Sequence, residues 1–459
     1  MRKLFLFLTA FFTVFLLSAV YAPITASAGT VTIAGNTNLT VGGFILGYYG
    51  ESSNQNLVSS QANNPGIVNT STSNSTKFSG TLDFTRLWLN LDNKPEGITG
   101  YVSADFNGSG PQGTGQGIRL RRAYLIKSFD ESNFTPWIEI GQDYNLGQPV
   151  GFSFSAYQNA GLAGDEASVP IWVPQIMFGT KIKTAVVTLN PEIGLMDLQG
   201  ESGSGNYTEF MSNAGDSGVQ SISASAPGFG VKLPVDFKTG FGAPSSLYGA
   251  FEGQDVNVNY GGSSTTYLKK TEFGWAASGG ITIPVSFVTF MGDVQYTHGM
   301  TGLNTVLGQE NLGNYTPEAF WSATGNNVNA TKAIQWDLQA KIDLTRFGAP
   351  VNIAGGYSKV SFSNYNGAEG ATNLADNYTA WSKGNTSYQT ISTTPTITYM
   401  SYDASPIRNS SSIFANIGWN VTKSMMLGLE WDHNITSYAV DPNAYFQSNA
   451  VYMIGMYSF

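Results

Sequence analysis

Cysteine is absent from the 459-residue chain, and only two histidines occur, His298 and His433. Without thiols there can be no disulfide framework and no cysteine chemistry. The two histidines fall at the ends of different expected strands, which argues against a metal site or a Ser/His pair. We therefore expect no metal, no cofactor and no enzymatic activity.

Charged residues are also scarce, at 12% of the chain, where a soluble domain usually carries about 25%. The formal net charge is −9, so no basic face for nucleic acid is expected. Net charge alone does not decide the ion preference of a channel, since a few charges inside a pore outweigh those on distant loops.

Long apolar runs are limited to the first residues. Arg2 and Lys3 precede the apolar run 4–17, and the small residues Ala26-Ser27-Ala28 follow it. This pattern is typical of a secretory signal over residues 1–28, with an uncleaved helical anchor as the alternative. No later segment approaches the ~20 apolar residues of a spanning helix, so residues 29–459 would cross a membrane as strands.

The end of the chain, 449–459, has apolar residues at every second position. A strand in hydrocarbon needs partners for both edges, because each unsatisfied backbone group there costs several kcal/mol. We therefore predict a closed barrel, with the buried last strand of a soluble β-sandwich as the alternative. The final aromatic residue resembles the closing strand of bacterial outer-membrane barrels. The alternating set is Val451, Met453, Gly455, Tyr457 and Phe459.

Alternation of this kind recurs along the chain, most sharply in 98–107 and 334–344. Short connections alternate with long ones, as the two ends of an outer-membrane barrel require. We predict an all-β fold, a transmembrane antiparallel β-barrel of sixteen strands, with turns at 190–192 and 227–230 among others. The expected strands are 38–49, 80–92, 98–107, 117–129, 137–144, 175–189, 193–200, 219–226, 235–251, 269–284, 286–298, 334–344, 351–362, 413–419, 425–432 and 449–459.

A barrel of sixteen strands leaves an aqueous interior. The third long connection, 145–173, is our candidate for a loop that folds inward and narrows the pore. The alternative is a loop packed over the mouth or at a subunit contact. The connection 145–173 carries the acidic pair Asp165 and Glu166, which are further candidate pore-lining residues.

Strand parity selects the other candidate pore-lining residues. Arg122 falls on the opposite face from its neighbouring arginines, so it should lie near a membrane interface, at a subunit contact, or beyond a bulge that reverses parity. Opposed basic and acidic walls would set a transverse field; alternatively, the charges pair off and rigidify the wall. The candidates are Arg119, Arg121, Lys127, Lys181 and Lys183 on the basic side and Asp105, Glu139 and Asp143 on the acidic side.

One family resemblance rests on the segments FTRLWLNLDN, GYVSADF, GIRLRRAYL and WIEIGQDYNLGQPVGFS within 84–157, followed by VPQIMFGTKIK at 173–183. Their order resembles that of the DcaP-like trimeric porins and, more loosely, the phosphate-selective porins O and P. The resemblance implies a sixteen-stranded trimer that passes small, often anionic solutes. The residues after Gly29 lack coiled-coil heptads, and the third loop lacks the dense lysines of a phosphate trap.

From these patterns we expect a passive porin in the outer membrane of a Gram-negative type bacterium. Its partners would be outer-membrane lipid, small hydrophilic solutes and two further copies of itself. The alternative is a structural or adhesive surface barrel, in which the long loop 363–409 binds partners.

Overall fold

The computed structural model describes residues 29–34, 36–53, 76–82, 85–108, 117–129, 133–147, 154, 172–198, 219–224, 226–240, 243–261, 267–300, 319–321, 328–363, 407–438 and 441–459. The expected signal segment 1–28 lies outside this part of the chain. So do the acidic pair Asp165 and Glu166 and most of the expected partner-binding loop, residues 364–406.

The described chain is almost entirely β-structure. The strands are β1 (Gly29–Ala34), β2 (Thr37–Ser53), β3 (Thr76–Thr81), β4 (Arg86–Asn93), β5 (Ile98–Gly108), β6 (Gly117–Ser128), β7 (Phe134–Tyr144), β8 (Trp172–Lys183), β9 (Val187–Leu189), β10 (Glu192–Met196), β11 (Val219–Ala224), β12 (Gly228–Phe237), β13 (Ser245–Gly261), β14 (Tyr267–Val285), β15 (Val288–His298), β16 (Ala319–Trp321), β17 (Val328–Ala330), β18 (Lys332–Asp343), β19 (Val351–Ser363), β20 (Ile407–Asn420), β21 (Met425–Tyr438) and β22 (Asp441–Ser458). One short 3-10 helix, η3 (Leu344–Phe347), follows β18.

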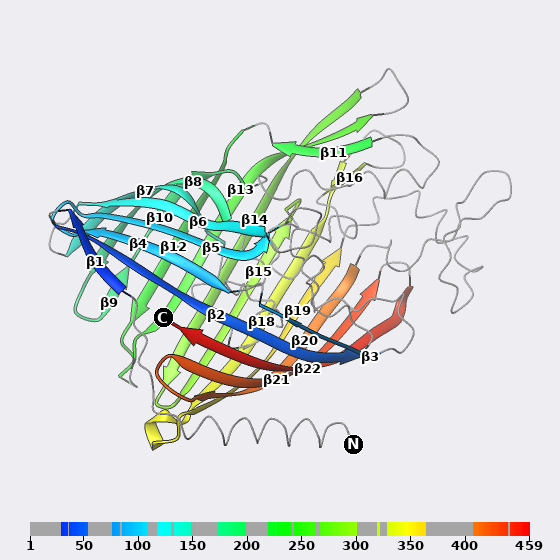
Figure 1. Ribbon diagram of the computed structural model, residues 1–459. Coiled ribbons are helices and arrows are strands. Elements are labelled where there is room, and N and C mark those ends of the chain that lie inside the picture. The colour runs from blue at the N-terminus through cyan, green and yellow to red at the C-terminus, as the bar shows by residue number, and fades with distance from the viewer. Residues whose placement is uncertain are drawn as a thin grey trace, which may run out of the picture.

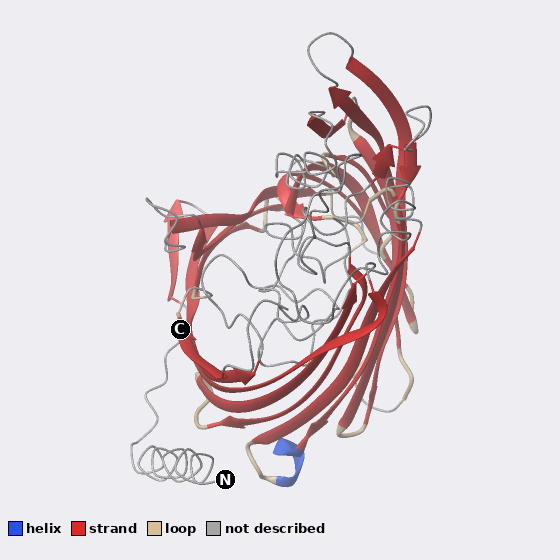
Figure 2. Cartoon of the chain, turned by 90° about the vertical axis from the view of Figure 1, so that its right-hand side faces the viewer, coloured by secondary structure: helices blue, strands red, loops and turns tan. Residues whose placement is uncertain are grey.

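The strands form a closed antiparallel barrel, seen nearly end-on in Figure 2. Closure occurs where β22 pairs with β21 on one side and with β2 on the other. Beyond the last strand residue, Phe459 and Gly43 exchange two backbone hydrogen bonds of 3.1 and 3.0 Å. The two partners expected for the final strand are therefore confirmed.

Sixteen strand positions make up the wall, as predicted, because three pairs of labelled elements each occupy one position. β3 and β4 both pair with β2. β9 and β10 both pair with β8 and β12, and β11 and β12 both pair with β13. Outside the wall, β1 forms a hairpin with the start of β2, and β16 pairs with β17.

Two predicted turns are wrong. Residues 190–192 and 227–230 interrupt or continue a strand, whereas the chain reverses at 184–186 and again between β12 and β13. Proline misled the prediction, since Pro191 removes one ladder donor without ending the strand. Its carbonyl still accepts from the Thr180 N–H at 3.1 Å. Each error displaces a turn along the chain without adding or removing a strand, so the predicted count of sixteen is unaffected.

The barrel is apolar outside and polar inside. On β18, Ile334 and Leu338 are exposed outward, while Gln335, Asp337 and Gln339 are buried on the inner face. Exposed apolar side chains on the outer face of a closed barrel are what lipid requires. Among the described residues, no helix is long and apolar enough to span a membrane.

Short turns gather at one end of the barrel, on the left of Figure 1, together with the C terminus. They include Lys94–Gly97, Ser286-Phe287 and η3. At the other end β13 and β14 reach 17 and 19 residues. A tilted spanning strand needs only about 9–11 residues, so this hairpin projects beyond the membrane thickness, at the upper right of Figure 1.

Candidate functional site

Three arginines of β6 lie on the inner wall because of a β-bulge. Ser103 of β5 pairs with Arg122, but the next residue, Ala104, pairs with Leu120, so Arg121 is the extra residue of β6. A bulge reverses strand parity beyond it. Arg119 therefore faces inward before the bulge and Arg122 faces inward after it. Of the three explanations considered for Arg122, the bulge is the one the structure contains.

Each arginine is paired with a carboxylate on a neighbouring strand. Asp105 of β5 accepts from Arg119 Nε at 3.1 Å, from Arg119 Nη2 at 2.8 Å and from Arg121 Nη1 at 2.6 Å. Asp143 of β7 accepts from Arg122 Nε and Nη2 at 2.5 and 3.0 Å. Two-point pairing of this kind holds a guanidinium in a fixed plane.

Aromatic rings complete the cluster. The guanidinium carbons of Arg119 and Arg121 lie 5.0 and 4.4 Å from the Trp172 ring centre. Tyr101, Tyr124 and Tyr144 surround Arg122 at 5.0, 5.1 and 4.6 Å. Cation–π contacts contribute most where the cation is desolvated, and Arg121 has no exposed surface.

The bulge also corrects one predicted pore-lining residue. Lys127 lies beyond the bulge and pairs with Ile98 and Ile138 on the outer face. Its ammonium donates to the backbone carbonyl of Glu96 in the neighbouring turn. Lys127 is thus not a lumen residue, because the parity that placed it inside was counted through an uninterrupted strand.

The remaining described candidates do not form one group. Glu139 is buried on the inner face of β7 and accepts from Gln175 Nε2 at 2.8 Å. Lys181 and Lys183 share the inward parity of Gln175 but are exposed near the turn end of β8. The structure does not bring them to the arginines.

Of the two charge arrangements considered, opposed walls and charges that pair off, the arginines of β6 show the second. They and the carboxylates Asp105 of β5 and Asp143 of β7 lie on adjacent strands of one wall and pair with one another. Sequence reasoning missed Arg86 of β4, which is 4% exposed and belongs to the same wall. Arg86 has the opposite strand parity to the outward-facing Leu87, Leu89 and Leu91, and this parity could have predicted its inward position.

The chain after β7 turns into the barrel. Asn145 Nδ2 donates to Glu252 Oε1 at 2.7 Å, and the Gly147 N–H donates to Glu252 Oε2 at 3.2 Å. Ser278 Oγ donates to the Gly147 carbonyl at 3.0 Å. Glu252 and Ser278 lie on the inner faces of β13 and β14, four and five strand positions from β7. These three bonds hold residues 145–147 inside the wall.

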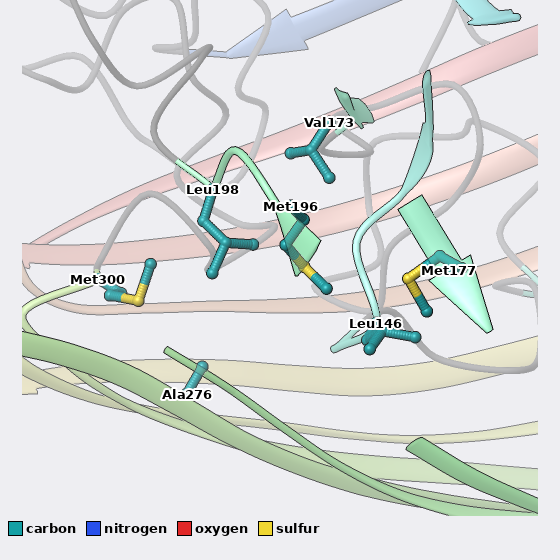
Figure 3. Close-up of a cluster of buried hydrophobic side chains, with 7 residues drawn as sticks. All are labelled: Leu146, Val173, Met177, Met196, Leu198, Ala276 and Met300. Carbon is teal, nitrogen blue, oxygen red and sulfur yellow. The ribbon is translucent and has the colours of Figure 1, made fainter. Parts of the chain in front are cut away.

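An apolar cluster fixes the same segment. Leu146 belongs to a buried cluster that includes side chains from β8, β10 and β14, drawn in Figure 3. Gly230 of β12 leaves the room for it, because a Cβ at that position would lie 2.8 Å from Leu146 Cδ1. The cluster consists of Leu146, Val173, Met177, Met196, Leu198, Ala276 and Met300.

Phe154, nine residues after Asn145, contacts the far wall. Its N–H donates to Gln339 Oε1 of β18 at 2.6 Å, and its carbonyl accepts from Asn416 Nδ2 of β20 at 2.8 Å. Its ring packs on Ala354 and Phe414, and Lys341 Nζ lies 5.0 Å from the ring centre. Since β19 stands eight positions from β7 in a ring of sixteen, the chain reaches the opposite side of the barrel.

Buried carboxylates support these far-wall contacts. Asp337 accepts from the amide of Gln339 at 2.8 Å, and Glu430 accepts from the amide of Asn416 at 2.7 Å. Each acid thus orients the amide that binds Phe154. Asp293 and Asp432 add two more buried acids to the inner faces of β15 and β21. Within the described chain, no group of three or more acids or histidines has metal-binding geometry.

Solved structures with a similar fold include an outer-membrane channel. The chain is similar to the outer-membrane channel DcaP of Acinetobacter baumannii, with a TM-score of 0.63 and 15% identity over 92% of this chain and 98% of that one. It is also similar to OprB of Pseudomonas putida, with a TM-score of 0.52 and 11% identity over 91% of this chain and 94% of that one. A third similar structure is OmpF of Salmonella typhi in complex with daunomycin, with a TM-score of 0.51 and 10% identity over 92% of this chain and 98% of that one.

No protein-family model and no curated protein sequence matches the chain. At these identities the structural likeness establishes the fold. The fold is that of an outer-membrane porin barrel.

Proposed function

We propose that the protein is a passive diffusion channel for small hydrophilic solutes across a bacterial outer membrane. The observation that carries this proposal is a closed sixteen-strand barrel with an apolar outer face and a charged, polar inner face. Barrels of this strand number enclose a channel, whereas eight-stranded barrels are filled by side chains. Transport then needs no cofactor and no catalytic step.

The third long connection, 145–173, stays our proposed constriction, supported at its described residues 145–147 and 154. Its supports are the bonds of Asn145 and Gly147 to Glu252 and the four contacts of Phe154 with β18, β19 and β20. A chain held at both sides of a ring divides the opening that the ring encloses. Solutes would pass beside this segment, next to the arginines of β6.

Anionic solutes are the proposed preferred class. Arg119 and Arg122 keep 22% and 20% of their side chains exposed, whereas Asp105 has none exposed and Asp143 has 12%. The positive ends of these ion pairs are therefore more accessible than the negative ends. On the far wall, Asp337, Glu430 and Asp432 are at most 1% exposed. Accessible charge inside a narrow passage governs ion preference.

Single-channel recording in planar bilayers tests the proposal. Stable open-channel steps are expected from the purified protein, with a reversal potential in a salt gradient that indicates anion preference. A protein that inserts but gives no steps would contradict the channel function and would favour the adhesive barrel. A trimer is proposed from the family resemblance, and native mass measurement in detergent tests it separately.

A further inference from the structure

A second cluster of polar groups lies on the inner face of β21, apart from the arginine wall. Glu430, Asp432 and Asn434 occupy alternate positions on this strand, so their side chains share one face. All three are fully buried, with no exposed surface. Two of them are carboxylates, separated by a single residue.

Asp432 lacks the partners that the other buried acids have. The residues directly opposite it on the two neighbouring strands are Phe414 and Ala450, which offer no donor side chain. In the described part of the chain, neither carboxylate oxygen of Asp432 has a hydrogen-bond partner. Glu430, by contrast, accepts from Asn416.

Asn434 and Ser412 repeat the pattern one row further along the barrel. They face each other across β21 and β20. Both amide atoms of Asn434 and the hydroxyl of Ser412 are buried and, among the described residues, without a hydrogen-bond partner. Asp432, Asn434 and Ser412 therefore place unpaired oxygens on adjacent rows of one inner face, next to the buried carboxylate of Glu430.

This arrangement is costly without a ligand. A buried carboxylate needs a compensating charge or donor, and the effective penalty is several kcal/mol per ion. Arginines compensate Asp105 of β5 and Asp143 of β7, but the residues directly opposite Asp432 are apolar. Carboxylate, amide and hydroxyl oxygens are the donor set that hard cations prefer, and calcium tolerates irregular oxygen geometry better than magnesium.

We propose that the inner face of β21 binds a hard divalent cation of the calcium class, with Asp432 and Asn434 as principal ligands and Ser412 as a neighbouring oxygen donor. Glu430 supplies the second negative charge that matches a divalent ion. Glu430 also accepts from Asn416, whose amide donates to the Phe154 carbonyl, so the proposed site lies next to the contacts that hold Phe154 on the far wall.

The competing explanation is a proton bound to Asp432 in place of a metal. Calorimetric titration of the detergent-solubilised full chain with CaCl₂ separates the two. Saturable binding of a single Ca²⁺ per chain is expected, with a rise in the thermal unfolding temperature as Ca²⁺ is added, because a ligand that binds the folded state stabilises it. Absence of saturable binding in the wild-type protein overturns the proposal.

Variants assign the ligands. Asp432→Asn should weaken Ca²⁺ binding by more than about tenfold, and Asn434→Asp should strengthen it, since an anionic oxygen replaces a neutral one. Asp293→Asn is the matched control: it removes another buried inner-wall carboxylate, on β15, and should leave Ca²⁺ affinity unchanged. Equal losses in Asp432→Asn and Asp293→Asn, or weaker binding by Asn434→Asp, contradict the assignment. The titration requires no ion flow, so it stands apart from the conductance test.

Discussion

The two sides of the barrel interior treat buried charge differently. On the β5–β7 side, Asp105 and Asp143 pair with arginines at 2.5–3.1 Å, so the wall compensates itself. On the far side, Asp337 and Glu430 accept hydrogen bonds from neutral amides. The first wall keeps its cations oriented toward the interior, whereas the second uses acids to orient amides that bind the backbone of another segment.

This difference separates two roles within one pore. The arginine wall can act on passing solutes, because parts of Arg119 and Arg122 remain exposed. The far wall acts on the protein itself, because its acids are covered and its amides bind Phe154. Substitutions on the two sides should therefore change different properties.

The largest effect is expected at Asp105. Asp105→Ala leaves the fully buried Arg121 without its 2.6 Å partner, and breaking a buried pair costs about 3–5 kcal/mol. Urea unfolding from lipid vesicles measures the loss. Asp143→Ala is the internal comparison: Arg122 is partly exposed and also contacts Tyr124, so a smaller loss of about 1–3 kcal/mol is expected. Equal losses would show that burial does not set the strength of these pairs.

The second-largest effect is expected at Glu252, where substitution should change the channel conductance more than the stability of the fold. Glu252→Ala removes the charged acceptor shared by Asn145 and Gly147, and a loss of about 1.5–3 kcal/mol in total is expected. The segment would then leave the wall, and single-channel conductance should rise. Asp255→Ala is the control: it removes an acid from the outer face of the same strand, and its conductance should equal that of the wild type. An unchanged conductance in Glu252→Ala would remove Glu252 from the anchor.

Phe154→Ala should have a smaller effect. It deletes the ring that packs on Ala354 and Phe414 but keeps both backbone hydrogen bonds, so a loss of about 1 kcal/mol is expected for a half-buried ring. Open-channel current noise should increase while mean conductance changes little. Recordings at high bandwidth measure the noise. A quiet channel in this variant would mean that the ring does not hold the segment.

Ion preference provides the finest comparison. The double variant Arg119→Gln/Arg122→Gln should lower the chloride-to-potassium permeability ratio about two- to fivefold, corresponding to about 0.5–1 kcal/mol of differential interaction. Lys127→Gln removes a cation from the outer face of the same strand and should leave the ratio unchanged. Reversal potentials in a salt gradient give both values. A similar shift in both variants would contradict the inward placement of the arginines.

Periodicity predicted the wall well where strands run without interruption. The expected strand 334–344 corresponds to β18 at 332–343, and Asp105 of β5 is buried on the inner face, as predicted. Prediction failed where a local irregularity changes the count. Pro191 interrupts a strand without turning it, and the bulge at Arg121 places Lys127 on the outer face. The position of Arg122 among apolar neighbours allowed a bulge as one explanation, but the sequence did not choose among the three, so Lys127 was assigned to the wrong face.

Contacts across the barrel could not be predicted from the sequence, for a different reason. Asn145 and Glu252 are 107 residues apart, and Phe154 and Asn416 are 262 apart. These contacts depend on how the closed ring brings strands to opposite sides. The sequence placed an inward segment at 145–173 only by its position among the connections, and it held no indication of which wall would bind it.

Disulfide trapping tests the crossing of the interior most directly, because the chain contains no cysteine of its own. Phe154→Cys combined with Ala354→Cys joins two positions that pack together. Phe154→Cys with Ile353→Cys, on the outer face of the same strand, is the control. We predict a cross-link in the first pair alone, with a single-channel current that is steady when oxidised and noisier after reduction. Failure of the first pair to cross-link in the folded protein would contradict a segment that spans the barrel to its far wall.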